Sequence, residues 1–261
     1  MIVEAFEVKV GYGDKTILSD ISLSFERGQI HSILGPNGCG KSTFLKAIAK
    51  QLNIEQGNVV LNHKQLNQWK RKELAREVAF LMQSHAGTPD ITVQKLIAYG
   101  RFPHKKPLQR LDQQDEEIIS WAMDLTNLTY LANRNITSLS GGERQRAWIA
   151  MALVQQPNIL LLDEPTTYLD IHHQLEIIEL VKELNKKHGM TVIMVLHDLN
   201  QAASVSDQLA VFSQGKLYSK GTPLEVISIE MLQEVFRIDA HIGVETSSGK
   251  PYIGQMKLLN K

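Results

Sequence analysis

The sequence predicts an α/β fold with a mostly parallel sheet, helices on both of its faces and one helical insertion. Three observations support this prediction. Strand-like runs alternate with helical patterns at both ends of the chain, helical periodicity dominates residues 84–157, and 43% of the 261 residues are apolar. A chain of this length buries enough surface to fold without disulfides, and its one cysteine can form neither an internal disulfide nor a zinc site alone.

The charge balance and the first residues narrow the class of protein. The chain has 28 basic and 28 acidic residues, which argues against a protein that binds nucleic acid or anionic lipid through overall charge. Met1–Val10 alternates like a strand and lacks the features of a signal peptide, and no run approaches the ~20 apolar residues of a membrane span. We therefore expect a cytoplasmic protein that needs a partner if it acts at a membrane.

The first 83 residues are expected to contain mainly strands. Gly11–Asp14 reads as a turn because of its glycines, and alternating apolar residues in Ile17–Phe25 suit a strand packed on one face. The expected strands are Glu4–Val10, Ile17–Phe25, Ile30–Leu34, Val59–Leu61 and Val78–Leu81, and the expected helix is Ser42–Gln51.

Helices are expected to dominate the middle of the chain, and alternation returns after Pro157. Arg101–Arg110 reads as a solvated basic loop, and Gly249–Ile253 as one arm of a small hairpin. The expected helices are Val93–Ala98, Glu116–Leu125, Arg144–Leu153, His173–Lys187 and Leu199–Ser206. The expected strands are Ile159–Leu162, Thr191–Leu196, Leu209–Ser213 and Lys216–Ser219, the last two forming a hairpin.

A glycine-rich loop between an expected strand and an expected helix carries the first chemical signal. Gly35-Pro-Asn-Gly-Cys-Gly-Lys41-Ser42 matches the phosphate-binding loop pattern in the context that the pattern requires. Its glycines let backbone N–H groups converge on phosphate oxygens at a helix N-terminus. Lys41 is expected to reach the β- and γ-phosphates, and the Ser42 hydroxyl to ligate Mg²⁺.

Two carboxylates follow the apolar strand Ile159–Leu162, which places them at the carboxyl edge of the sheet. Asp163 is expected to hold Mg²⁺, and Glu164 to polarise the attacking water as general base or to orient it. The alternative is a pair of solvated acids at a strand end. The presence of the phosphate loop favours the Mg²⁺ and water roles over this alternative.

Leu139-Ser-Gly-Gly-Glu-Arg-Gln-Arg146 is the third signal. Ser140 and Glu143 form a capping box at the start of a helix. A capping box does not need the two consecutive glycines between its members, and such glycines at a helix start make a second anion site.

These three motifs, in this order, resemble an ATP-binding-cassette (ABC) ATPase over nearly the whole chain. The resemblance implies a P-loop NTPase cassette with a RecA-like core, an N-terminal antiparallel β subdomain and an inserted α-helical subdomain. It implies one domain over residues 1–261, with the core and β subdomain at 1–83 and 159–225, the helical subdomain at 84–158 and a C-terminal extension at 226–261.

The resemblance also assigns roles that the residues alone do not. Tyr12 matches the aromatic that stacks on adenine, Gln83 the glutamine near Mg²⁺ and water, and His197 the histidine that contacts the γ-phosphate. Tyr168-Leu169-Asp170 matches the loop that crosses the dimer interface, although many members have a small residue where this chain has Tyr168. The implied catalytic residues are Glu164, His197, Gln83 and Lys41, and the implied Mg²⁺ residues are Ser42, Gln83 and Asp163. The implied ATP contacts are Tyr12, Gly35, Pro36, Asn37, Gly38, Cys39, Gly40, Lys41, Ser42, Thr43, Ser140, Gly141, Gly142 and Asp170, with Cys39 a small space-filler.

The family's mechanism implies the partners. Two cassettes form a head-to-tail homodimer around two ATP molecules, with Ser140 and Gly142 of one chain closing over the nucleotide of the other. Because the chain has one cassette and no membrane span, it resembles the peripheral ATPase subunit at the cytoplasmic face of the membrane. It would power transport through separate integral-membrane permease subunits.

Softer signals point to importers of iron–siderophores, haem and vitamin B12, which also use an extracytoplasmic chelate-binding protein. They are Gly35–Gly40, Tyr99–His104, Val195–Ala202 and Gly249–Ile253. Iron–siderophore uptake is the expected function; the alternatives are haem, vitamin B12 or another metal, an exporter, or a soluble ABC ATPase acting on DNA or ribosomes. The last has little support, because the chain has neither a coiled-coil or zinc-bearing insertion nor a second cassette, and its zero net charge predicts no nucleic-acid partner.

Overall fold

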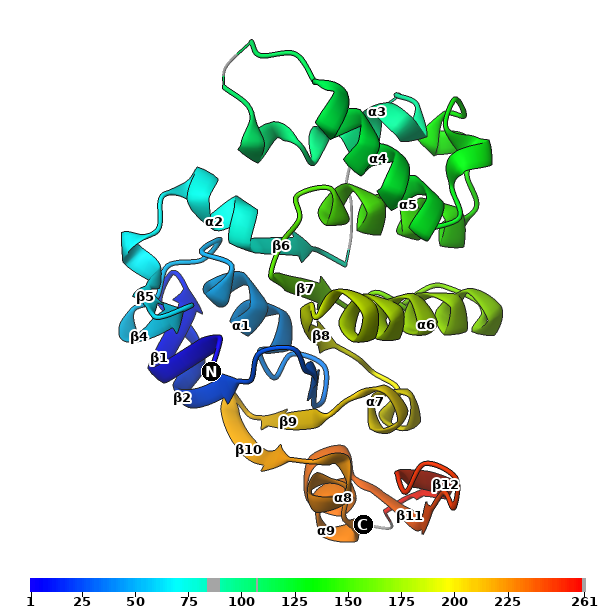
Figure 1. The fold of residues 1–261 in the computed structure, drawn as a ribbon. Coiled ribbons are helices and arrows are strands. Elements are labelled where there is room, and N and C mark those ends of the chain that lie inside the picture. Colours follow the sequence, from blue (N-terminus) through cyan, green and yellow to red (C-terminus); the bar gives the residue numbers. More distant parts are fainter. Residues whose placement is uncertain (84–89, 107, 260–261) are drawn as a thin grey trace. The chain divides into compact units, whose positions relative to one another are not determined.

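The structure is a computed structural model that describes residues 1–83, 90–106 and 108–259 (Figure 1). The chain divides into two compact units, here called unit 1 (Met1–Gln68 with Thr191–Lys261) and unit 2 (Trp69–Met190). No helix in the described part of the chain is both long enough and apolar enough to cross a membrane.

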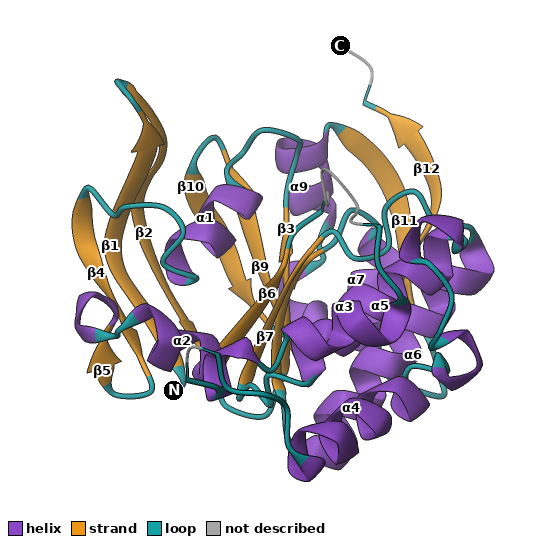
Figure 2. Ribbon diagram, turned by 90° about the horizontal axis from the view of Figure 1, so that it is seen from above, coloured by secondary structure: helices purple, strands orange, loops and turns teal. Residues whose placement is uncertain are grey.

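The first sheet of unit 1 is antiparallel, with strand order β2-β1-β4-β5 (Figure 2). Its strands are β1 (Val3–Tyr12), β2 (Lys15–Phe25), β4 (Gln56–Leu61) and β5 (Lys64–Gln65). Apolar residues that alternate along β1 and β2, such as Val8, Val10 and Ile21, are fully buried. The predicted turn at Gly11–Asp14 is shorter than expected, because Tyr12 still pairs with Lys15 and only two residues turn between the strands.

The second set of strands in unit 1 has the order β10-β9-β3-β8, and β3 is parallel to both of its neighbours. The strands are β3 (Ile30–Leu34), β8 (Thr191–Val195), β9 (Gln208–Ser213) and β10 (Lys216–Gly221). Every residue of β3 and β8 is buried, as expected for strands that are covered on both faces. Gln214 and Gly215 both have positive φ, at 50° and 76°, which is the conformation of the two-residue hairpin turn predicted between β9 and β10.

Two helices of unit 1 follow strands of this sheet. They are α1 (Lys41–Ile48) and α7 (Leu199–Val205). Phe44 of α1 is fully buried, and its ring centroid lies 5.4 Å from that of Phe212 in β9. The helix predicted over Ser42–Gln51 ends earlier than expected, at Ile48, and Lys50 beyond it adopts a φ of +57° that a helix does not allow.

A C-terminal hairpin packs on α7. Two short helical segments, α8 (Pro223–Val226) and α9 (Ile229–Met231), and a π-helical turn (Leu232–Phe236) lead into it. The hairpin consists of β11 (Ile238–Val244) and β12 (Pro251–Leu258), which includes most of the predicted arm. The Asn200 side chain of α7 donates to the carbonyl of Ile253 at 2.9 Å and accepts from its N–H at 2.7 Å.

Unit 2 contains two parallel strands and most of the helices. In β6 (Val78–Leu81) and β7 (Ile159–Asp163), Val78 pairs with Ile159 and Leu81 with Leu162. The helices are α2 (Arg71–Glu77), α3 (Val93–Tyr99), α4 (Gln113–Leu125), α5 (Gly141–Leu153) and α6 (Ile171–His188). The sequence prediction missed α2, whose only buried residue is Leu74. One apolar contact gives no helical periodicity to detect.

The segment Arg101–Arg110 is only partly the solvated loop that its composition predicts, since two of its cations are buried. The side chains of Arg101 and Lys105 are buried, together with Asp115 of α4. Arg101 Nε lies 2.9 Å from Asp115 Oδ1, and Lys105 forms ion pairs with both Asp115 and Asp112. Two cations can be buried here because the Asp115 carboxylate, 14 positions after Arg101, neutralises both of them together with Asp112.

A glycine allows this buried arrangement. A Cβ placed on Gly100 would lie 2.0 Å from the carbonyl oxygen of Met151 in α5, so only glycine lets the end of α3 approach α5 this closely. Arg101 then reaches the carbonyl oxygen of Val154 with Nη1 at 2.6 Å. The ion pairs therefore connect the start of α4 with the end of α5 inside unit 2.

Candidate functional site

The glycine-rich loop lies in unit 1 between β3 and α1, as predicted. Gly35, Gly38 and Gly40 have φ values of 144°, 77° and 106°, a region that side chains disfavour. A Cβ on Gly35 would also lie 2.2 Å from the carbonyl oxygen of Phe212. Gly40 is the N-cap of α1 and supplies no side-chain cap, and the start of a helix is a favourable place for an anion.

Lys41 lies inside this loop and is buried. Its Nζ donates to the carbonyl oxygens of Gly35 at 2.8 Å and Pro36 at 3.0 Å. An ammonium group has three N–H donors, so the two carbonyls hold the charge at the loop while one donor is left over for a phosphate oxygen. Ser42 and Thr43 follow in the first turn of α1.

Cys39 is buried in the same loop, as a space-filling residue should be. Its Sγ would lie 2.8 Å from a Cβ on Gly35, so the thiol occupies the space beside that glycine. Burial raises the pKa of the Cys39 thiol, although the Lys41 charge opposes this effect. The thiol is therefore less reactive than an exposed one.

His197 emerges at the same edge of the sheet as the loop. Ile33 of β3 pairs with Val195 of β8, so Gly35 and His197 each lie two residues beyond a paired position. His197 is exposed there. Tyr12, at the end of β1, is also 49% exposed, which leaves its ring accessible for stacking on a base.

The predicted catalytic carboxylate lies in unit 2, beside the predicted glutamine. Asp163 is the buried last residue of β7, and Glu164 follows with a φ of +53°. The pairing of Leu81 with Leu162 brings Gln83 level with Glu164, and the Gln83 amide donates a hydrogen bond to Glu164 Oε2. These three residues therefore form one cluster at the carboxyl edge of β6 and β7.

Sequence analysis did not identify a second group that contacts Glu164. Thr167 donates its hydroxyl hydrogen to Glu164 Oε2 at 3.1 Å, and its N–H donates to the Glu164 carbonyl at 3.3 Å. The spacing of three residues, directly after a strand end, is the signal that could have predicted a turn closed by this threonine.

The capping box predicted at the start of α5 is present. Ser140 Oγ accepts from the Glu143 N–H at 3.2 Å, and Glu143 Oε2 accepts from the Ser140 N–H at 2.8 Å. The backbone hydrogen bond from Ser140 lowers the pKa of Glu143. The cap thus fixes the helix start without using the N–H groups of the two glycines that follow.

Both of these glycines lie against the start of α6. A Cβ on Gly141 would lie 3.5 Å from Leu169, but one on Gly142 would lie 2.4 Å from Cγ of His173. Asp170 caps α6 by accepting from the His173 N–H at 3.0 Å. Gly142 is therefore required by packing as well as by its proposed contact with phosphate.

Gln83, the start of α5 and the loop around Tyr168 surround one cavity of unit 2, of about 350 Å³. Tyr168 is 93% exposed, with a φ of +65°. An exposed aromatic ring held on a capped helix start is typical of a residue that packs against a partner. The structure thus brings Gln83, Gly141 and Tyr168 around one space.

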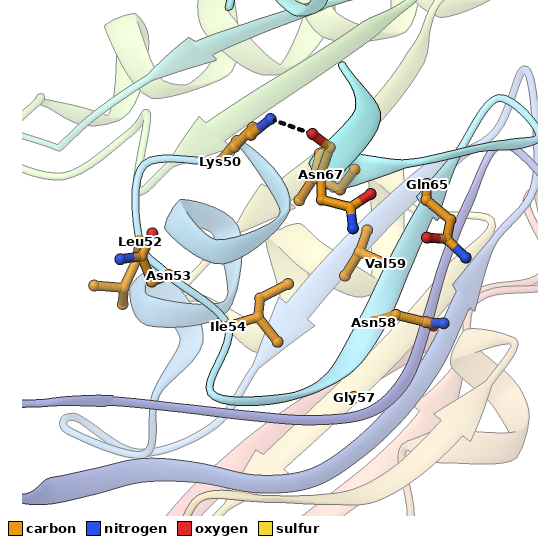
Figure 3. A pocket seen from close by; sticks show the side chains of 10 residues that line it. Lys50, Leu52, Asn53, Ile54, Gly57, Asn58, Val59, Gln65 and Asn67 are labelled. Atoms are coloured by element: carbon orange, nitrogen blue, oxygen red, sulfur yellow. Dashed lines mark hydrogen bonds between the residues drawn. The ribbon is translucent and has the colours of Figure 1, made fainter. Parts of the chain in front are cut away.

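Another pocket, in unit 1, lies away from the phosphate loop (Figure 3). It is lined by residues after α1 and by β4 and β5, including Ile54, Val59 and Leu66, and Lys50 donates to the carbonyl of Asn67 at 3.1 Å beside it. No residue of the phosphate loop lines it. It therefore has no part in the candidate nucleotide site.

The predicted site residues thus fall into two groups. Unit 1 holds Tyr12, the loop Gly35–Thr43 and His197. Unit 2 holds Gln83, Ser140–Gly142, Asp163, Glu164 and Asp170. The first group provides phosphate-binding backbone, the second provides hydrogen-bonded acids, and both include charged side chains. Phosphoryl transfer requires groups of these kinds.

Comparison with known proteins identifies the family. The family model described as ABC transporter matches residues 18–167. The iron(3+)-hydroxamate import ATP-binding protein FhuC of Bacillus subtilis (strain 168) is 45% identical over 94% of this chain and 91% of its own length. The petrobactin import ATP-binding protein FpuC of Bacillus anthracis is 45% identical over 100% of this chain and 95% of its own length.

Solved structures confirm the fold. A metal-chelate type ABC transporter in an inward-facing conformation matches with a TM-score of 0.84 and 25% identity, over 97% of this chain and 96% of that one. The dimeric ATP-binding cassette MJ0796 bound to ADP and Pi matches with a TM-score of 0.73 and 27% identity, over 85% of this chain and 98% of that one. The predicted ABC cassette fold is correct, and the chain belongs to the ABC transporter family, whose ATP-binding proteins hydrolyse ATP to power transport.

Proposed function

We propose that this chain is the ATP-hydrolysing subunit of a bacterial importer for an iron–siderophore or a related metal chelate. The observation that carries the proposal is the 45% identity to the iron(3+)-hydroxamate and petrobactin import proteins, which extends over 94% and 100% of this chain. The similarity includes the C-terminal hairpin on α7 as well as the nucleotide motifs. The transported chelate would be recognised by the membrane permease and by an extracytoplasmic binding protein, not by this subunit.

The phosphate loop would bind ATP through its backbone N–H groups and Lys41. Two carbonyls hold the Lys41 ammonium at the loop, at 2.8 and 3.0 Å, so little side-chain movement is needed to reach a phosphate oxygen. Tyr12 would stack on adenine, and His197 would contact the γ-phosphate from the end of β8. Gly38 and the remaining loop residues would form the cradle.

Ser42, Asp163 and Gln83 offer a hydroxyl, a carboxylate and an amide oxygen. Hard oxygen donors of this kind fit Mg²⁺, which usually keeps several waters and bridges to phosphate. When bound, Mg²⁺ would neutralise charge on the β- and γ-phosphates. Asp163 is 4% exposed, so its carboxylate is held in place by burial at the strand end.

Glu164 would act on the attacking water. Gln83 and Thr167 both donate to its Oε2, which orients the carboxylate for accepting a proton from water. Ser140 and Gly142 would close over the nucleotide of a second copy, because in the family two cassettes dimerise and pair with permease subunits. Hydrolysis would then require the dimer.

We also propose the division of the chain that the family suggests. The core and β subdomain would comprise residues 1–83 and 159–225, the helical subdomain 84–158 and the C-terminal extension 226–261. The placement at the cytoplasmic face of the membrane follows from the proposed permease partners.

The decisive experiment combines uptake with mutation of Glu164. In cells that lack the gene, complementation with wild type should restore uptake of radioactive iron supplied as a hydroxamate or catecholate chelate, whereas Glu164→Gln should not. Haem and cobalamin uptake, measured in the same cells, should be unchanged. Loss of haem or cobalamin uptake with normal iron-chelate uptake would overturn the choice of cargo.

Purified protein tests the chemistry separately. Glu164→Gln should keep ATP affinity, reduce turnover by orders of magnitude and accumulate as an ATP-bound dimer, because it removes the base but not the binding groups. Lys41→Ala should lose ATP binding as well. An unchanged rate in Glu164→Gln would refute the role of Glu164.

A further inference from the structure

Three potential metal ligands lie together on the first turns of α6. His172, His173 and Glu176 each offer one ligand atom, and the three atoms lie within 4.8 Å of one another. His172 and Glu176 are four residues apart and therefore share a face of the helix. Among the residues that the structure describes, no other group of three histidine, cysteine or acidic side chains meets the same criterion.

The two oxygens of Glu176 have different surroundings. Oε2 accepts from Arg146 Nη1 at 2.5 Å and lies 2.8 Å from His173 Nδ1. Oε1 faces His172 Nε2 at 3.6 Å. Two ligands bound to one tetrahedral zinc ion at about 2.0–2.2 Å lie about 3.3–3.6 Å apart. His172 Nε2 and Glu176 Oε1 are thus already at a separation that one ion can bridge.

His173 has the orientation of a metal-binding imidazole. If Nε2 carries the proton, Nδ1 keeps its lone pair for a metal, and Nδ1 lies 2.8 Å from Glu176 Oε2. Asp170 Oδ2 lies 3.9 Å from His173 Nε2 and adds negative charge. Asp170 thus lies on the side of the nitrogen that does not bind the metal, where a carboxylate supports many metal-bound histidines.

Charge and access both favour a cation here. Asp170 and Glu176 contribute two negative charges against the one positive charge of Arg146, when both imidazoles are neutral. Arg146 competes only for Oε2. Although burial alone would raise the pKa of Glu176, the hydrogen bond to His173 and the charge of Arg146 lower it, so the carboxylate is ionised at neutral pH. The His172 side chain is 78% exposed, so an ion can reach it from solvent.

We propose that His172, His173 and Glu176 form a binding site for a divalent transition metal ion such as Zn²⁺, with water completing the coordination. Two imidazoles and one carboxylate suit zinc and its neighbours better than Mg²⁺ or Ca²⁺, which prefer oxygen ligands. The site is distinct from the proposed Mg²⁺ residues Ser42, Gln83 and Asp163.

Occupancy of the site has a consequence for α5, which rests on the proposed function. The His173 ring lies against Gly142, where a Cβ would approach its Cγ to 2.4 Å. Drawing ligand atoms together from as much as 4.8 Å to the spacing around one ion moves this ring or the first turn of α6. Because Gly142 would contact the nucleotide of a second copy, bound metal lowers ATP hydrolysis.

Isothermal titration of the untagged protein with Zn²⁺, without nucleotide, tests the site. Wild type should bind one equivalent saturably, and His172→Ala should bind at least tenfold more weakly. Glu176→Gln should weaken binding similarly, and its amide oxygen can still accept from Arg146, so the fold is preserved. His241→Ala, which removes an exposed imidazole from β11, is the matched control and should bind like wild type.

Equal affinity in wild type and His172→Ala, or the absence of saturable binding, would overturn the site. ATPase assays at fixed free Zn²⁺, set with a metal buffer because ATP chelates zinc, test the consequence. Wild type should be inhibited at least twofold and His172→Ala should not; equal inhibition of both would overturn the link to α5. ATP hydrolysis measured without zinc tests the proposed ATPase function separately. If the protein does not hydrolyse ATP, the zinc-binding isotherm is unaffected, because it is measured without nucleotide.

Discussion

The buried ion pairs of unit 2 predict that Asp115→Asn strongly destabilises this unit. Asp115 is 1% exposed and neutralises both Arg101 and Lys105, which are 5% and 9% exposed. Asparagine has almost the same shape and can still accept the Asp112 N–H bond of the helix cap, which measures 2.9 Å. The substitution therefore keeps the shape and removes the charge and the oxygen that accepts from Arg101.

The magnitude follows from the pKa and from burial. Burial alone would raise the pKa of Asp115, but hydrogen bonds from Lys105, the Asp112 backbone and Arg101 lower it from 3.8 to about 2. This shift corresponds to about 2 kcal/mol of stability at neutral pH. Asparagine also leaves the buried Arg101 without its carboxylate and Lys105 with Asp112 alone, and breaking a buried pair in this way costs about 3–5 kcal/mol. Because the second effect is the larger, we expect Asp115→Asn to lower the free energy of unfolding by about 3–5 kcal/mol.

The pH dependence has a definite sign. Because the folded-state pKa is lower than the unfolded-state value, the contribution of Asp115 is fully present above pH 3.8 and is lost as the pH falls toward 2. The difference between wild type and Asp115→Asn should therefore be constant between about pH 5 and 8.

Urea denaturation followed by tryptophan fluorescence measures this loss selectively. The three tryptophans, Trp69, Trp121 and Trp148, all belong to unit 2. With a urea m-value of about 2 kcal/mol per M, the midpoint should fall by about 2 M. Glu117→Gln, which removes an exposed charge from the same helix, should change stability by less than about 0.5 kcal/mol. A loss below about 1 kcal/mol for Asp115→Asn would refute the reasoning.

Three further predictions concern unit 1. Gly35→Ala should abolish ATP binding because its Cβ would lie 2.2 Å from the Phe212 carbonyl oxygen. Gly38→Ala has open space but a φ of +77°, so it should lower the free energy of unfolding by only about 1–2 kcal/mol. Equal effects of the two variants in calorimetry would contradict this prediction. Alkylation of Cys39, followed by mass spectrometry, should be slow at pH 7, speed up with pH and block ATP binding; full ATPase activity after complete labelling would refute it. Asn200→Ala should increase hydrogen exchange in β12, because it removes both bonds to Ile253; unchanged exchange would refute the anchoring role.

Element type and order could be read from the sequence wherever the apolar pattern was strong. Ile30–Leu34 and Val78–Leu81 are strands with the predicted bounds, because both are short and mostly apolar. The weaker predictions failed for local reasons. The helix at Ser42 ends early, and Gly11 still lies in a strand that continues to Tyr12.

Much of the candidate site was likewise accessible from sequence. The residues of the phosphate loop, the two acids after Ile159–Leu162 and the capping box are contiguous motifs whose chemistry depends on local spacing. Thr167 beside Glu164 and His173 on Gly142 were not predicted. The spacing after the strand end could have predicted the turn at Thr167, whereas the contact of His173 with Gly142 depends on helix packing and has no local signal.

The sequence by itself determined the family, the order of the elements and the identity of the nucleotide motifs, because each depends on neighbours in the chain. Tertiary structure decided which charges are buried. Arg101 and Asp115 are 14 residues apart, and nothing in the composition of a basic loop indicates that α4 and α5 enclose it. Burying a cation is favourable only beside a fixed opposite charge, and that charge is placed by packing, which a local pattern does not encode.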